Sequence, residues 1–209
     1  MGNEQKSGAV RPMGRMPAGG AGQGNQSTVN TQQDRIKSEW FVLGCQQGDP
    51  AAFEQLVGLW QAPLWRYVRR MTGDDSAAWD VVQETWIATA QGLLRLQDAA
   101  AFPAWLYRIA SNKARDWIRR ESRRRAVYED YTRAVAAPDA AEPRTGASLA
   151  ELLEGLPRDV QWILQLRYEQ GFSTREIAAI LSVPEGTVRS RLHHARLSLK
   201  KYLEENGDD

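Results

Sequence analysis

The chain has 209 residues, of which 42% are hydrophobic, and its formal net charge at pH 7 is +1, so one or two small domains with modest cores are expected. Its only cysteine, Cys45, excludes an internal disulfide framework and a cysteine-rich zinc site, and it suits a reducing, cytoplasmic compartment. No apolar run approaches the ~18 residues of a membrane span and the N-terminus lacks a hydrophobic signal core, so neither membrane insertion nor export is expected.

The pattern along the chain divides it into five parts. Residues 1–33 are rich in Gly, Gln, Asn and Ser without periodicity, which predicts a disordered extension. Helical periodicity runs over residues 34–125, whereas residues 126–147 are rich in Ala and Pro without an apolar face and predict a linker. A second, smaller helical domain is expected over residues 148–203, followed by an acidic tail at 204–209. The predicted fold class is all-α, with two helical domains joined by a flexible linker.

Helical periodicity predicts four segments in the first domain. The first ends before Asp49, a good N-cap, which is followed by Pro50 at the first position of the second helix. The second segment ends at Gly73, and the third runs from there to about Leu94. The fourth begins near Ala101 and continues into a stretch rich in arginine and lysine.

The third segment, residues 77–90, reads AAWDVVQETWIATA. Its apolar positions predict an inward face made of Val82, Trp86, Ala90 and Leu93. The opposite face carries an acidic and amide patch at i, i+3 and i+4, formed by Asp80, Gln83 and Glu84. Such a patch is a poor surface for DNA and a suitable one for a basic protein partner, although the same composition is also typical of a plain solvated face.

The fourth segment, residues 102–120, reads FPAWLYRIASNKARDWIRR. Its expected buried face consists of Trp105, Leu106, Ile109, Ala110, Trp117 and Ile118. Along another face, cations and an amide recur at i, i+4, i+7 and i+11, namely Arg108, Asn112, Arg115 and Arg119. Cations suit phosphates and an amide can bond a base edge, while Tyr107 and residues 94–101 could add stacking or a pocket for an unpaired base. The alternative is a solvated basic face, but a second DNA-binding element downstream favours nucleic acid.

Residues 173–203, STREIAAILSVPEGTVRSRLHHARLSLKKYL, have the pattern of a helix-turn-helix. The inward positions of its two helices are Ile177, Ala178 and Leu181, then Val188, Leu192, Ala195 and Leu199. Capping boxes are expected at Ser173-x-x-Glu176 and at Ser182-x-x-Glu185, with Pro184 in the first turn of the longer helix. The second predicted domain therefore ends in a helix-turn-helix.

The outward face of the longer helix is expected to enter a DNA major groove. At about 100° per residue this face consists of Gly186, Thr187, Ser190, His193, His194 and Leu197. Arg189, Arg191 and Arg196 flank the strip, where they could reach phosphates. The adjacent histidines lack the i, i+4 spacing of a metal pair, so no metal is expected. A solvated basic helix at the end of a bundle is the alternative.

Three of these segments, in this order, resemble the extracytoplasmic-function (ECF) sigma factors, the small two-domain class of bacterial RNA polymerase initiation factors. AAWDVVQETW is similar to the family's DAEDLVQETF segment, which docks on the clamp helices of the largest polymerase subunit. FPAWLYRIASNKARDWIRR is similar to its FRAWLYRIARN segment, which recognises and opens the −10 promoter element. The helix-turn-helix resembles the region that reads the −35 element, and the whole resemblance covers about residues 35–203.

The resemblance implies a sigma factor that binds core RNA polymerase, directs it to promoters and promotes DNA opening, without an enzymatic step or a cofactor of its own. Its implied partners are core polymerase and promoter DNA, with an anti-sigma factor as a further candidate. By position, polymerase would be bound by Asp80, Gln83 and Glu84. The −10 element would be contacted by Arg108, Asn112, Lys113, Arg115 and Arg119, of which Asn112 would hold a flipped base. The −35 element would be contacted by Arg189, Ser190, His193, His194 and Arg196.

Three features depart from the family pattern. Ala77 and Trp79 stand where the family usually has acidic residues, His194 stands where many relatives have arginine, and residues 1–33 have no counterpart. Two other classes of protein fit less well. A two-component or quorum-type regulator would need a strand-containing receiver or ligand domain, and an anti-sigma-type adaptor bundle would leave the two basic faces unexplained.

Overall fold

The computed structural model describes residues 31–132, 153 and 155–206, and no strand occurs among them. In chain order the helices are α1 (Thr31–Gln46), α2 (Pro50–Thr72), α3 (Asp75–Gly92), α4 (Phe102–Thr132), α6 (Arg158–Leu164), α7 (Thr174–Leu181) and α8 (Glu185–Asn206). Two 3-10 turns, η1 (Leu93–Arg95) and η2 (Ala99–Ala101), connect α3 to α4, and a π-helical turn, η3 (Gln165–Glu169), follows α6. The predicted all-α class is confirmed. None of the described helices is both long and apolar enough to span a bilayer.

Local caps set the helix boundaries in the first domain. Asp49 accepts a hydrogen bond from the amide of Ala51 at 2.9 Å and thereby starts α2, as predicted. Gly73 ends α2 with φ 74°, and Asp74 then accepts from the amide of Ala77 at 2.7 Å to start α3. A side chain is strained at that left-handed φ, so the short connection between α2 and α3 depends on glycine.

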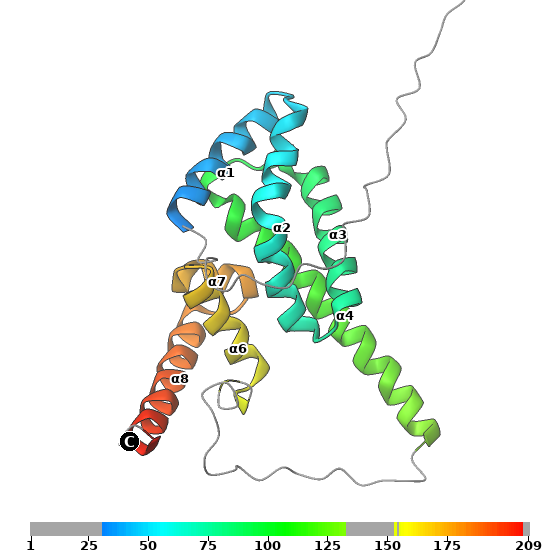
Figure 1. The fold of residues 1–209 in the computed structure, drawn as a ribbon. Coiled ribbons are helices and arrows are strands. Elements are labelled where there is room, and N and C mark those ends of the chain that lie inside the picture. The colour runs from blue at the N-terminus through cyan, green and yellow to red at the C-terminus, as the bar shows by residue number, and fades with distance from the viewer. Residues whose placement is uncertain (1–30, 133–152, 154, 207–209) are drawn as a thin grey trace, which may run out of the picture.

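Helices α1 to α4 form one bundle around an aromatic core (Figure 1). The fully buried rings of Tyr67 and Tyr107 lie with their centroids 5.1 Å apart. The hydroxyl of Tyr67 shares a 2.8 Å hydrogen bond with Ser111, and the indole of Trp60 donates to Ser38 at 2.7 Å. Burial raises the pKa of Tyr67, so its hydroxyl stays neutral and the core holds no charge there.

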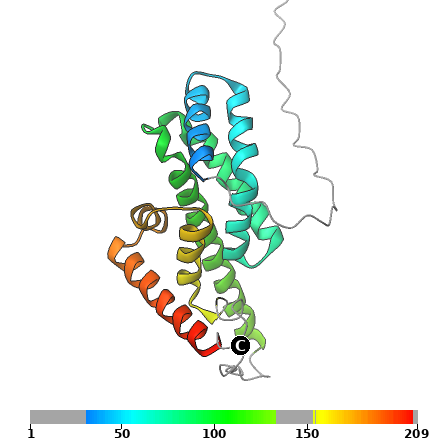
Figure 2. The ribbon, with the colours of Figure 1, turned by 60° about the vertical axis from the view of Figure 1, so that its left-hand side comes forward.

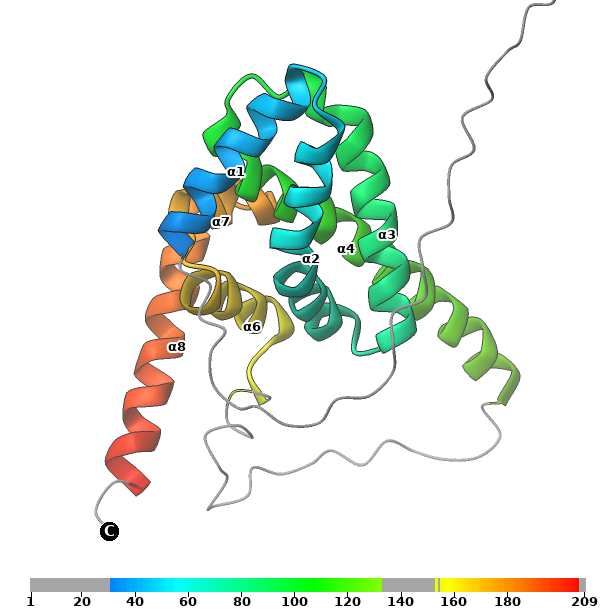
Figure 3. The same cartoon turned by 45° about the horizontal axis from the view of Figure 1, so that its top comes forward.

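The second unit, α6 to α8, packs on the side of this bundle, with α7 against α4 and α6 against α2 (Figures 2 and 3). The predicted capping box of α7 is present. The Ser173 hydroxyl accepts from the Glu176 amide at 3.2 Å, and the Glu176 carboxylate accepts from the Ser173 amide at 2.8 Å. Most predicted inward positions are buried, namely Ile177, Leu181, Val188, Leu192 and Ala195, while Ala178 and Leu199 are half-buried.

Several predicted boundaries are wrong. Helix α4 continues to Thr132, past the expected end at residue 125, and the remaining expected linker residues, 133–147, lie outside the described residues. The sequence beyond residue 125 has no apolar stripe to indicate a helix, and the ion pairs from Glu121 to Arg124 and Arg125 lie in the turn before it. At the two ends, α8 extends to Asn206 and α1 begins at Thr31, whereas residues 1–30 lie outside the described part.

Two details of the predicted helices also need correction. Ser182 does not cap α8, because it closes α7 in the left-handed region with φ 54°, and Glu185 accepts instead from the Thr174 hydroxyl at 2.9 Å. The turn is so short that its first residue belongs to the preceding helix. Ala90, expected to face inward, is exposed, and the neighbouring Thr89 takes the buried position while its hydroxyl bonds the Thr85 carbonyl at 2.8 Å.

Candidate nucleic-acid interface

The acidic and amide patch on α3 is exposed as predicted. Asp80, Gln83 and Glu84 all point away from the bundle core. The carboxylate of Glu84 pairs with the Lys113 ammonium of α4 at 3.1 Å, so a lysine expected to contact DNA borders the acidic patch. Asp80 and Glu84 also line a cavity of about 330 Å³ between α3 and α4, together with the half-buried ring of Trp117.

The predicted polar face of α4 divides into exposed and half-buried members. Arg108 and Asn112 are exposed, and Arg119 is exposed but paired with Asp116. Arg115 is half-buried and is fixed by hydrogen bonds. Its guanidinium donates to the Asn112 amide oxygen at 3.2 Å and, across the domain boundary, to backbone carbonyls of α7. This partial burial lowers the pKa of Arg115, although the group remains a cation.

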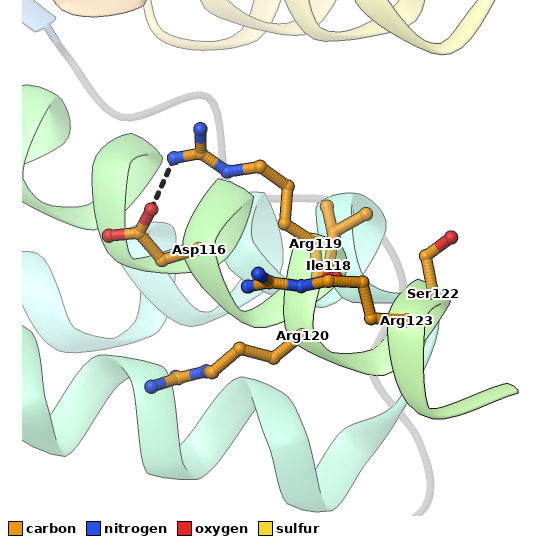
Figure 4. Close-up of a pocket in the computed structure, with 6 residues that line it drawn as sticks. All are labelled: Asp116, Ile118, Arg119, Arg120, Ser122 and Arg123. Atoms are coloured by element: carbon orange, nitrogen blue, oxygen red, sulfur yellow. Dashed lines mark hydrogen bonds and ion pairs between the residues drawn. The ribbon is translucent and has the colours of Figure 1, made fainter. Parts of the chain in front are cut away.

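The C-terminal part of α4 carries a basic groove. Its volume is about 730 Å³, and it is lined by Asp116, Ile118, Arg119, Arg120, Ser122 and Arg123. Figure 4 shows the three arginine side chains extending back along the helix in the direction of Asp116. A row of guanidinium groups at this spacing suits a sugar-phosphate backbone rather than a single small anion.

Tyr107 does not offer an accessible stacking surface in this structure, contrary to the prediction. Its ring is fully buried among Tyr67, Trp60 and Phe172, and its hydroxyl donates to the Gln170 side chain at 2.6 Å. Burial raises its pKa well above the ordinary range. An aromatic residue at this point of the sequence pattern is equally suited to a core, and the fold uses it there.

The loop before α4, which was expected to offer a pocket for an unpaired base, is partly open to solvent. Leu94 is exposed, and Asp98 caps η2 by accepting from the Ala100 amide at 3.0 Å. A Cβ at Gly92 would lie 2.8 Å from the ring of Trp105, so glycine allows the end of α3 to approach the start of α4. The expected buried face of α4 is formed by fully buried Leu106 and Ala110 and half-buried Trp105, Ile109, Trp117 and Ile118.

The outward face of α8 is open to solvent. Ser190, His193, His194 and Leu197 are all exposed, and the two imidazole rings lie 5.8 Å apart. In the part of the chain that the structure describes, no group of His, Cys, Asp and Glu is arranged to hold a metal.

The arginines that flank this face differ in their contacts. Arg189 is exposed and pairs with Glu185 at 2.7 Å, and exposed Arg196 donates to the Tyr168 hydroxyl at 3.0 Å. Arg191 instead forms a 2.7 Å ion pair with Asp159 of α6, so it is turned toward its own domain rather than toward a phosphate.

The sequence did not indicate the contacts between the two units. Arg35 of α1 forms an ion pair with Glu176 of α7 at 2.7 Å, and its guanidinium also lies over the Phe172 ring. Arg70 of α2 pairs with Glu169. A lone arginine near a helix start carries no pattern of its own, and the capping box alone explained the glutamate at position 176.

The acidic face of α3, the basic face of α4 and the helix-turn-helix together define a class of protein, which two family models identify. Residues 56–124 match the family model for Sigma-70 region 2, and residues 147–199 match the one for Sigma-70, region 4. The α1–α4 bundle therefore carries region 2 of a sigma factor, and the helix-turn-helix unit carries region 4.

Relatives narrow this class to one family. The chain is 35% identical over 172 residues to the ECF RNA polymerase sigma factor SigL of Mycobacterium tuberculosis, covering 79% of this chain and 97% of SigL. It is also 35% identical over 172 residues to the ECF sigma factor SigE of Mycolicibacterium smegmatis, covering 78% of this chain but only 66% of SigE. The chain belongs to the ECF sigma factor family.

Solved structures agree with this assignment. CnrH, in a complex with the cytosolic domain of CnrY, has a TM-score of 0.58 and 27% identity, and the match covers 83% of this chain and 99% of CnrH. The sigma factor RpoE of Bartonella quintana, in a complex with the anti-sigma factor NepR, has a TM-score of 0.56 and 25% identity, with 75% and 98% covered. As a sigma factor, this chain directs RNA polymerase to promoters and has a regulatory role in transcription initiation.

Proposed function

We propose that three helix faces divide the work of initiation. The α3 patch docks on the clamp helices of core polymerase, the α4 face captures and opens the −10 element, and α8 reads the −35 element. The observation that supports this division is that each face is exposed and has a charge suited to its partner. Acidic groups lie on α3, while cations flank an amide on α4 and polar groups on α8.

Docking rests on the exposed Asp80, Gln83 and Glu84. Two carboxylates with an amide between them attract a basic protein helix and repel a DNA backbone. The pair between Glu84 and Lys113 is exposed enough for either partner to change its contact at low cost. Ala77 is buried and cannot contribute to this patch, so its charge comes from Asp80 and Glu84.

Opening of the −10 element rests on Asn112, whose exposed amide can both donate to and accept from a base edge. Arg108 and Arg119 lie exposed on the same helix and would hold the strand by its phosphates. Unstacking costs a few kcal/mol per base, so opening requires that captured bases and backbone contacts offset this cost. Arg115 and Lys113 would join these contacts once their present partners release them.

Reading of the −35 element rests on α8. Ser190, His193 and His194 are spaced at i, i+3 and i+4, so they share one face of the helix, and all are exposed. A major groove about 12 Å wide admits such a helix. Arg189 and Arg196 flank the face and would contact phosphates on either groove wall.

The partners we propose are core RNA polymerase and promoter DNA. The protein would act in the cytoplasm, where these two meet. An anti-sigma factor is a further proposed partner, because the related RpoE and CnrH were each solved with a partner bound.

Permanganate footprinting of unpaired thymines on a promoter duplex tests the role of α4. Core polymerase with the wild-type chain should make thymines near −10 reactive, whereas the Asn112→Ala variant should bind the closed duplex and leave them protected. On a template already melted at −10, the variant should recover activity. An equal loss on melted and duplex templates would contradict a role in opening. Gln91→Ala, at an exposed amide of α3, is the matched control.

A further inference from the structure

Tyr168 is an exposed aromatic residue that lies outside the outward face of α8. It belongs to η3, the π-helical turn in which the Gln170 amide donates to the Gln165 carbonyl at 3.2 Å. The turn buries Gln165 and Leu166 and leaves Tyr168 58% exposed. Single π turns occur often at functional sites, so the exposed ring at this turn is a candidate for a function of its own.

The Tyr168 hydroxyl holds one arginine of α8. It accepts a hydrogen bond from the Nε atom of Arg196 at 3.0 Å, across 28 positions of the sequence. Both side chains are exposed. A guanidinium carries N–H groups on Nε and on both Nη atoms, so a bond through Nε leaves the planar fork of Nη donors that suits a phosphate. Tyr168 therefore fixes the direction of Arg196 without using the donors that a phosphate would take.

Arg196 also differs in its charge balance from the other arginines beside the outward face of α8. Arg189 pairs with Glu185 at 2.7 Å. Arg191 pairs with Asp159, also at 2.7 Å. Among the residues that the structure describes, no carboxylate forms an ion pair with Arg196. A phosphate can therefore approach this guanidinium without displacing a carboxylate.

The Tyr168 hydroxyl keeps a donor of its own. A phenolic hydroxyl has one O–H group and can also accept, and toward Arg196 its oxygen accepts. Within the described part of the chain, nothing accepts the hydrogen of this hydroxyl. An anion bound at the Nη fork of Arg196 can take this hydrogen as well. Donors from two separate elements, η3 and α8, are thus available to one phosphate.

We propose that Tyr168 and Arg196 form a clamp for one phosphate of the −35 DNA backbone, in which Arg196 is the binding cation and Tyr168 positions it. This rests on the proposed reading of the −35 element by α8. The clamp carries no sequence information, because phosphate contacts set register and orientation rather than base choice. It fixes how Ser190, His193 and His194 meet the bases, so η3 contributes to promoter binding although it lies outside the recognition helix.

A double-mutant cycle in the complex of the full chain with core polymerase tests the coupling. Affinity is measured by anisotropy with a fluorescein-labelled duplex carrying the −35 element that the wild-type complex enriches most from a randomised library. Tyr168→Phe keeps the ring and loses only the hydroxyl, and it should weaken binding about fivefold. In an Arg196→Ala background, the same substitution should weaken binding by less than about twofold. Equal losses in the two backgrounds would overturn the positioning role of Tyr168.

Arg189 provides the matched control, because its partner is Glu185 of its own helix rather than Tyr168. Tyr168→Phe and Arg189→Ala should therefore weaken binding by factors that simply multiply. Thermal melting of each chain reports the fold. Tyr168→Phe should leave the melting temperature nearly unchanged, because the hydrogen bond that it removes is exposed.

Neutral methylphosphonate linkages, placed one at a time along the −35 backbone of the same duplex, locate the phosphate. One linkage should weaken binding of the wild-type chain but not of Arg196→Ala, and Tyr168→Phe should show a smaller loss there than the wild type. Losses of the same size at the same positions in all three chains would overturn the clamp. A wild-type chain that enriches no −35 element with core polymerase would instead contradict the proposed function of α8.

Discussion

Reversal of charge on the α3 patch should weaken binding of core polymerase while leaving the chain folded. The change is Asp80→Lys combined with Glu84→Lys, which places two ammonium groups where a basic polymerase helix is proposed to dock. Like charges across an interface cost several kcal/mol, and each 1.4 kcal/mol is a factor of ten, so affinity for core polymerase should fall by about 100-fold or more.

The cost to the fold is much smaller and can be worked from the contacts. Glu84 loses one ion pair with Lys113, 3.1 Å long and with side chains 52% and 29% exposed, which is worth at most about 1 kcal/mol. A lysine beside Lys113 adds a repulsion of similar size. Asp80 is exposed, so its replacement should cost no more than about 0.5 kcal/mol.

Fluorescence anisotropy with labelled chain and core polymerase gives the affinity, and thermal melting reports the fold. Asp80→Lys alone should weaken binding at almost unchanged melting temperature, which makes it the cleaner variant. Glu54→Lys, at an exposed carboxylate of α2, is the matched reversal and should bind as the wild type does. Undiminished affinity in a folded double variant would refute docking through this patch.

Other predictions concern the second unit and one turn. The His194→Arg variant should select different −35 sequences from a duplex library, and an unchanged preference would show that His194 does not read the bases. Arg196→Ala should instead weaken binding to all sites alike and reduce the slope of log affinity against log salt concentration by about 1. Because the pKa of Glu176 is lowered in the fold, thermal stability should be constant above its ordinary value of 4.5 and decline as pH falls below it, less so in Glu176→Gln. Gly73→Ala should lower the free energy of unfolding by about 1 kcal/mol in a denaturant titration, because φ is 74° there.

Local patterns in the sequence predicted the elements well. The caps at Asp49 and Ser173 and the inward positions of α8 follow from interactions within a few residues, so periodicity and cap chemistry were sufficient. The C-terminal turns of α4 were missed because residues 126–132 show no apolar stripe from which periodicity could predict a helix. The predicted N-cap of α8 at Ser182 was wrong because the turn is short and Ser182 closes α7, the helix before the turn.

The sequence predicted which residues make up the candidate site, but it did not predict which of them are already engaged in contacts within the chain. Exposed positions such as Asn112 and His193 follow from helix geometry alone. The hydrogen bond from Tyr107 to Gln170 and those from Arg115 to α7 depend on a second unit distant in sequence, and no local pattern records such contacts. Residues suited to DNA are equally suited to a packed interface, because aromatic rings and guanidinium groups serve both.

Run-off transcription from a promoter library with purified core polymerase tests the central claim most directly. With the wild-type chain added, transcripts should begin at defined positions on a subset of templates that share −35 and −10 elements at a fixed spacing. Core polymerase alone should produce no such set. If the chain binds library duplexes yet adds no defined starts to core polymerase, it is an ordinary DNA-binding regulator and the account given for α3 and α4 is wrong.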